Sequence, residues 1–133
     1  MADELTKKQF TYRGKTIDEL KTLDVREFSK FLPSRARRTV LRQFQEIEKF
    51  VNRSREKMSK GKTIKTHNRY LVVVPHMVGM KIGIYNGQKF MTTEIIGEML
   101  GHKLGEFAPT RVRTKHGSAG VGATKGTRAK AKK

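Results

Sequence analysis

Apolar residues follow a helical period in the first half of this chain and strand-like runs in the second. Between residues 34 and about 55 they recur every three or four positions, which predicts a long α-helix with one buried face. The buried stripe consists of Val40, Phe44, Ile47 and Val51, flanked by Leu41 and Phe50. Between residues 66 and 113, β-branched runs and turn residues dominate. The pattern predicts an α+β fold in which N-terminal helices cover a small sheet.

The strongest strand signals lie in the second half. The run Tyr70 to Val74 is apolar and rich in β-branched residues, and Pro75 closes it, which predicts a strand buried on both faces. Asn86-Gly87 then separates Lys81 to Tyr85 from Gln88 to Thr92. Because both turn residues tolerate positive φ, this spacing predicts a hairpin with a two-residue type I′ turn.

A two-residue turn also fixes the register of the hairpin. Phe90 is then expected opposite Gly83, where its ring can cover a position that has no side chain. Ile82 is expected opposite Met91 in the same register.

Short helices are predicted on both sides of these elements. Helices are predicted at residues 17–22 and 25–31. Each begins at a pair of residues suited to capping a helix, and Pro33 ends the second helix. The capping pairs are Thr16 with Glu19 and Asp24 with Glu27. Another short helix, 94–100, is expected after the hairpin, with Gly101 as its terminator.

Four segments follow from these patterns. Residues 1–15 are polar and are expected to be flexible, 16–60 form a helical region, and 61–113 form an α/β core. The basic stretch 55–65 is expected to link the helical region to the core. Residues 114–133 are small and cationic, with almost nothing to bury, so we expect a basic tail that is disordered without a polyanion.

The sequence HKLGEFAPTR, which begins at residue 102, follows neither period. Leu104 and Phe107 are nonetheless too apolar for a free tail, so we expect this stretch to lie along a surface of its own domain or of a partner. Glu106 is a lone acid among cations. It is expected either to pair with Arg111 or Arg113 or to accept a hydrogen bond from a base.

Charge points to the class of ligand. The chain has 30 Lys and Arg against 12 Asp and Glu, a net charge of +18 that repels itself unless a polyanion is bound. Residues 57–133 hold 16 of the basic residues and only three acidic ones. Because soluble surfaces mix the two signs, this asymmetry indicates an anionic ligand. Nucleic acid is the first candidate and an anionic membrane the second.

Five cations form a ridge on the predicted long helix, opposite its apolar stripe. They are Arg35, Arg38, Arg42, Lys49 and Arg53. A solvated helix face usually interleaves Glu for i,i+4 pairing, whereas Glu46 and Glu56 only flank this ridge. Solvation and phosphate contact both account for such a face, and the pattern favours phosphate contact.

The sequence gives little indication of catalysis. There is no Cys, which excludes disulfides, thiolate chemistry and Cys-ligated zinc. The four histidines, His67, His76, His102 and His116, lack the spacing of a metal site. Gly61-Lys62-Thr63 does not complete a P-loop, because Glu56 occupies the position of its first glycine. No enzyme activity, metal or cofactor is therefore predicted.

Two other classes of protein remain as alternatives. A basic DNA-compacting protein would share the charge but would not need the irregular HKLGEFAPTR segment. An RNA-modifying enzyme would need a nucleophile, a metal or a cofactor loop. Membrane association is disfavoured, since no run of 18 apolar residues exists and the N-terminus resembles neither a signal nor a transit peptide. A cytoplasmic location is expected.

Two motifs carry a specific resemblance. PHMVGMKIGIYNGQKF, residues 75–90, followed by GHKLGEFAPTR, residues 101–111, resembles the signature of the small-subunit ribosomal protein S-nineteen family. The form it resembles is the longer archaeal and eukaryotic one, known in eukaryotes as S-fifteen-e. The resemblance spans about residues 65–113 and depends on the order of residues rather than on composition.

This resemblance implies a fold and a function. The fold would be a compact α+β domain with a small three-stranded sheet. The function would be that of a structural constituent of the small ribosomal subunit, seated on ribosomal RNA (rRNA) in the subunit head. Implied partners are rRNA and a neighbouring protein of the S-thirteen family, with the C-terminal tail pointing towards transfer RNA and the decoding region. A general basic RNA- or DNA-binding protein outside the ribosome is the alternative.

The resemblance also implies rRNA contact near the first strand, at the hairpin turn and along the extended segment after residue 101. The implied residues are Lys62, Lys65, His67, Asn68, Arg69, Asn86, Gly87, Lys89, His102, Lys103, Thr110 and Arg111. The five ridge cations, Lys81, Arg113, Lys115 and His116 complete the expected set. Asn68 and Tyr70 depart from the more basic bacterial pattern, and the ridge rests on the helical wheel alone.

Overall fold

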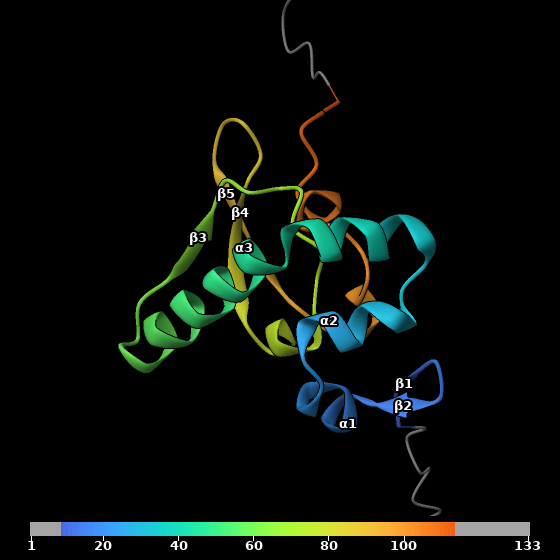
Figure 1. Cartoon of the computed structure of the whole chain (residues 1–133). Helices are drawn as coiled ribbons and strands as arrows, with labels where there is room; N and C mark the ends of the chain where they lie inside the picture. Colours follow the sequence, from blue (N-terminus) through green and yellow to red (C-terminus); the bar gives the residue numbers. More distant parts are fainter. Residues whose placement is uncertain (1–8, 114–133) are drawn as a thin grey trace, which may run out of the picture.

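A computed structural model describes residues 9–113 and shows an α+β domain, as predicted (Figure 1). The helices and strands are β1 Thr11–Tyr12, β2 Lys15–Thr16, α1 Ile17–Thr22, α2 Val25–Phe28, α3 Ser34–Ser59, β3 Ile64–Thr66, β4 Lys81–Tyr85 and β5 Phe90–Glu94. Short 3₁₀ helices occupy Ser29–Phe31, Pro75–Met77, Gly97–Met99 and Leu104–Phe107. The predicted tail, with Lys115 and His116, lies outside the described residues. In the part described, no helix is long and apolar enough to cross a membrane.

The main sheet has three strands in the order β3-β4-β5, with β3 parallel and β5 antiparallel to β4. β3 lies partly within the stretch 55–65, which the sequence predicted to be a linker. Ile64 and Thr66 are buried, whereas Lys65 between them points outward. This alternation over only three residues, among lysines, is too short to be recognised as a strand from sequence.

The prediction of a strand from Tyr70 to Val74 was wrong, although Leu71 to Val74 are all buried. This segment is extended and forms one isolated bridge, between Val72 and Lys103. Its backbone partners are residues 101–105: the Val73 N–H donates to the His102 carbonyl at 2.8 Å, and the Leu104 N–H donates to the Leu71 carbonyl at 2.9 Å. The buried run therefore pairs with the HKLGEFAPTR stretch, which lies on its own domain.

The hairpin forms at Asn86-Gly87, but its predicted register was wrong by two residues. Tyr85 pairs with Phe90, and residues 86–89 form the loop. The Asn86 side-chain Oδ1 accepts from the backbone N–H groups of Gln88 and Lys89, at 3.0 and 2.8 Å, and this closes the longer loop. Because side chains alternate with a period of two, the shift leaves each of them on its predicted face.

The predicted helix 94–100 was also wrong. β5 extends to Glu94, and backbone pairing continues past it: the Ile95 N–H donates to Met80, and the Gly79 N–H donates to Ile95. Only the 3₁₀ turn Gly97–Met99 is helical. Gly101 does end this turn, with a φ of +81° that favours glycine.

The N-terminal elements are more ordered than predicted. α1 and α2 begin at both predicted capping boxes. Residues 11–16, partly within the segment expected to be flexible, form the β1–β2 hairpin. Phe10 packs so closely on Gly97 that a Cβ there would lie 2.7 Å from its ring. This contact attaches the start of the described chain to the core.

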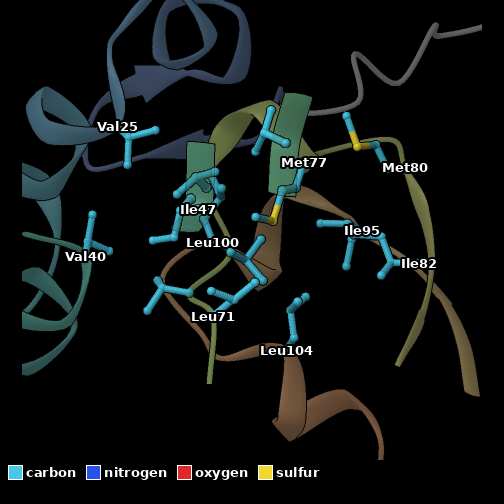
Figure 2. Close-up of a cluster of buried hydrophobic side chains, with 14 of the residues drawn as sticks. Val25, Val40, Ile47, Leu71, Met77, Met80, Ile82, Ile95, Leu100 and Leu104 are labelled. Atoms are coloured by element: carbon cyan, nitrogen blue, oxygen red, sulfur yellow. The ribbon is translucent and has the colours of Figure 1, made fainter. Parts of the chain in front are cut away.

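α3 crosses the molecule and supplies one wall of the core (Figure 1). Of the predicted stripe, Val40, Ile47 and Val51 are buried, Phe44 and Phe50 are half-buried, and Leu41 is 45% exposed. The helix is longer than predicted and is kinked at Gln43, which has non-helical angles of φ −117° and ψ 18°. Figure 2 shows side chains of α2, α3 and β4 meeting those of residues 71–77 and 95–104.

Arg69 connects three segments that are distant in sequence. Its guanidinium donates to the carbonyls of Tyr85 at 2.6 Å, Gly105 at 2.7 Å and Ala108 at 2.7 Å. Gly105 permits this approach, since a Cβ there would lie 3.0 Å from both the Arg69 Cβ and its carbonyl oxygen. The half-buried Arg69 therefore holds the end of β4 against the HKLGEFAPTR stretch.

We predict that Arg69→Met destabilises the domain by about 2–4 kcal/mol, because three carbonyls lose a charged donor. Urea unfolding followed by circular dichroism measures this change. Arg38→Met is the matched control, since Arg38 is exposed on α3, and it should change the free energy of unfolding by less than about 0.5 kcal/mol. Equal stability of the two variants would contradict the role of Arg69.

His76 makes the stability depend on pH. Burial and the nearby Arg55 and Lys21 charges lower its pKa below the ordinary value of 6.5, and they outweigh Asp24 and the Leu23 backbone, which raise it. The folded state therefore disfavours the protonated form. The associated stability is fully present above pH 6.5 and is lost as pH falls through the lower pKa of the folded state.

We predict that the free energy of unfolding declines more steeply below pH 6.5 in the unmodified chain than in His76→Gln. Chemical unfolding at a series of pH values measures this difference. His67 and His102 remain in both proteins, so their contributions cancel in the comparison. Parallel pH profiles would show that His76 does not contribute.

Candidate nucleic-acid interface

The five ridge cations of α3 are all exposed. The kink at Gln43 separates them into two groups, because Arg35, Arg38 and Arg42 precede it and Lys49 and Arg53 follow it. The helical wheel, which assumes a straight helix, could not predict this division. Arg38 and Arg42 of the first group line a shallow hollow of about 510 Å³. Arg37, which the sequence reasoning missed, and the exposed Leu41 line it as well.

Few carboxylates neutralise these cations. Within residues 9–113 the one salt bridge joins His102 Nδ1 and Glu106 Oε2 at 2.7 Å. Glu46, which flanks the ridge, instead accepts from the Tyr70 hydroxyl at 2.7 Å, and this hydrogen bond raises the pKa of Tyr70. The Lys and Arg charges of the described surface are therefore available to an external anion.

A second group of predicted residues lies at the end of β3. Lys65, His67 and Asn68 are exposed, and they line a cavity of about 230 Å³ together with Arg53 of α3. The structure thus brings the ridge and the strand end together. Lys57 also lines this cavity, and it was missed because it falls in the stretch that the sequence predicted to be a linker.

Arg69 is the exception among these predicted residues. Its guanidinium is engaged by the Tyr85, Gly105 and Ala108 carbonyls, so the structure assigns it to the fold rather than to the exposed surface. The three hydrogen bonds of Arg69 also place the hairpin loop beside the chain that continues from Ala108. Asn86, Gly87 and Lys89 lie in that loop.

The loop and the last described residues lie at one end of the molecule, away from α1 and the β1–β2 hairpin (Figure 1). Thr110, Arg111 and Arg113 are exposed there, as are Gly87 and Lys89. Asn86 is half-buried and uses its side chain to close the loop. This end therefore presents lysine and arginine side chains, of which Lys89 lies on a loop closed by hydrogen bonds.

The remaining predicted residues occupy two further positions. Lys62 and Lys81 line a hollow of about 430 Å³ between the end of α3 and β4, and both are exposed. His102 and Lys103 are exposed beside Glu106. The expected pairing of Glu106 with Arg111 or Arg113 was wrong, because its carboxylate binds the His102 ring and the Lys103 N–H.

The arrangement suits binding to a polyanion. Cations, amides and hydroxyls are distributed over α3, the outer face of the sheet and the loop end. Among residues 9–113, no group of three His, Asp or Glu side chains could hold a metal ion. Lys and Arg point charges on rigid elements bind phosphate without base preference, whereas base recognition needs aromatic faces or hydrogen-bonding edges.

Comparison with known proteins identifies the relatives of this chain. A family model described as Ribosomal protein S19 matches residues 34–116. The small ribosomal subunit protein uS19 of Methanococcoides burtonii is 40% identical over 123 residues, which cover 92% of this chain and 88% of the relative. The protein of the same name from Methanocella arvoryzae is 46% identical over 123 residues, covering 92% of this chain and 86% of the relative.

Proposed function

Because the chain belongs to the ribosomal protein S19 family, we propose that it is a structural component of the small ribosomal subunit that binds rRNA. Both relatives are named as small ribosomal subunit proteins, and the similarity to each extends over nearly the whole chain. The observation that carries rRNA binding is the exposed cationic surface, on which the one salt bridge within residues 9–113 involves His102 rather than Lys or Arg.

The proposed mechanism is scaffolding. Lysine and arginine side chains neutralise phosphates and set the orientation of the domain, while RNA shape, 2′-hydroxyls and a few unstacked bases supply specificity. The cations of α3, β3 and the hairpin loop lie on elements fixed by the core or by the Arg69 network, so their binding costs little ordering of the backbone. No covalent bond is made or broken in this function.

We place the domain in the head of the subunit, near the decoding region. There the neighbouring partner would be a protein of the S-thirteen family, and residues 114–133 would extend towards transfer RNA. These positions are those implied by the motifs at 75–90 and 101–111. In the cell the chain would reside in cytoplasmic ribosomes. A basic nucleic-acid-binding protein outside the ribosome is the competing proposal, and competition between structured RNA and duplex DNA separates the two.

We predict a steep salt dependence for binding to a small-subunit rRNA fragment. If the domain makes about 8 phosphate contacts, log K against log salt has a slope of about −6 to −7. Arg38→Gln combined with Arg42→Gln should weaken binding and reduce the slope by about 2, because each removed contact contributes roughly 1. Fluorescence anisotropy across a salt series measures both quantities.

Lys30→Gln is the matched control, because Lys30 is an exposed cation outside the proposed surface. It should leave the slope within about 0.5 of the unmodified chain, because it removes none of the proposed phosphate contacts. Equal slopes for the control and the double variant would remove the α3 ridge from the interface. Stronger binding to duplex DNA than to the rRNA fragment at equal salt would favour the competing proposal.

A further inference from the structure

Three rings meet on the face of the sheet that points away from the core. The ring centroids of His67 and Tyr85 lie 4.6 Å apart, those of His67 and Phe90 5.1 Å, and those of Tyr85 and Phe90 5.1 Å. The register produces this arrangement, since Tyr85 pairs with Phe90 and His67 follows β3 beside the end of β4. We call these three side chains the aromatic platform.

The aromatic platform is open to solvent. His67 is exposed, and Tyr85 and Phe90 are half-buried, whereas Ile82 and Ile84 on the other face of β4 are fully buried. Rings that belonged to the hydrophobic core would be buried, as these isoleucines are. Exposed aromatic faces on a sheet are typical of surfaces on which unpaired bases stack, because every base has a π face.

A cation lies on the same face. The nearest neighbours of a Cβ at Gly83 would be the Ile64 carbonyl oxygen at 3.3 Å, the Lys65 side chain at 3.4 Å and the Phe90 Cβ at 3.6 Å, so Lys65 and Phe90 both lie beside Gly83. The Lys65 Nζ lies 5.3 Å from the centroid of the Phe90 ring. Lys65 is therefore positioned both at the aromatic platform and at the cavity beside α3.

That cavity has the chemistry of a phosphate site. Arg53 and Lys57 of α3 and Lys65 of β3 line it, and no carboxylate does. Ser54 also lines it, is only 1% exposed, and its hydroxyl has no hydrogen-bond partner among the described residues. An unpartnered buried hydroxyl is unfavourable, so an anion that accepted its proton would remove a cost as well as neutralise charge.

We propose that the aromatic platform and this cavity form a subsite for one unpaired nucleotide of RNA. The base stacks on the platform, and its phosphate enters the cavity and accepts from Ser54, Arg53 and Lys57. His67 belongs to both features, and Lys65 lines the cavity and lies beside the platform, which places a base and its own phosphate in adjacent positions. This inference rests on the proposed function and specifies one element of its RNA ligand, an extruded or bulged nucleotide, since a paired base presents no free face.

The test uses two RNA hairpins that differ only in one bulged 2-aminopurine. The full chain should bind the bulged hairpin roughly 10-fold more tightly than the fully paired one and should quench the 2-aminopurine fluorescence, as expected for one stacked base. His67→Ala combined with Phe90→Leu should reduce this preference to about twofold or less, because the stacking surface is lost. Arg38→Gln is the control, and it should weaken binding to both hairpins equally.

Ser54→Ala tests the phosphate cavity, because the proposal predicts opposite changes in two measurements. The urea midpoint of unfolding should rise, since an unpartnered buried hydroxyl is removed, while affinity for the bulged hairpin should fall roughly fivefold or more, since a hydrogen bond to a charged phosphate is lost. A purely structural role for Ser54 would raise the midpoint and leave the affinity unchanged.

A crosslinking measurement on the unmodified chain avoids dependence on the folding of any variant. A 4-thiouridine at the bulge should crosslink to the segment 65–67 or 85–90, mapped by mass spectrometry. Crosslinks elsewhere, equal affinity for the two hairpins, or unchanged affinity in Ser54→Ala would each overturn the subsite. Tight, salt-dependent binding to both hairpins without preference would leave the proposed function intact, whereas weak binding to both would overturn the proposed function and the subsite together.

Discussion

The guanidinium of Arg69 is the interaction on which the arrangement of this domain most depends. It joins the carbonyls of Tyr85, Gly105 and Ala108, which lie 16, 36 and 39 residues further along the chain. The arginine guanidinium offers five N–H donors in a fixed plane, which suits it to hold three carbonyls from one position. Without it, the HKLGEFAPTR stretch would keep its backbone pairing with the buried run before Pro75 and the burial of Leu104 in the core. The same bonds hold the hairpin loop beside the chain that leaves Ala108, and this creates the cationic end of the molecule (Figure 1).

In the elements around this network, one face packs into the core and the opposite face carries exposed charge. α3 buries Val40 and Ile47 in the core (Figure 2). It exposes arginines on its other side. The sheet likewise buries Ile82 and Ile84 and exposes Lys65 and the aromatic platform. A core built in this way fixes the cations before any ligand is bound. The penalty is electrostatic self-repulsion, since the net charge is +18, and an RNA partner would relieve it.

Features set by local interactions could be predicted from the sequence, whereas those set by distant partners could not. Both N-terminal capping boxes were predicted and are present, because each involves residues only three positions apart. The motifs 75–90 and 101–111 together indicated the family. The hairpin register depended on the Asn86 side chain, and Arg69 was interpreted as an RNA ligand because its three carbonyl partners are remote in sequence. The aromatic platform follows from the observed register, in which Tyr85 pairs with Phe90, and the predicted register concealed it.

We propose above all that this chain binds rRNA as a component of the small ribosomal subunit. The most direct measurement is ultraviolet crosslinking in native lysate, followed by mass spectrometry of the RNA and protein fragments attached to the chain. We expect crosslinks from α3, the β3 end and residues 102–113 to small-subunit rRNA, within particles that also contain other small-subunit proteins. Crosslinks spread over DNA or unrelated transcripts, and absent from ribosomal particles, would contradict this proposal.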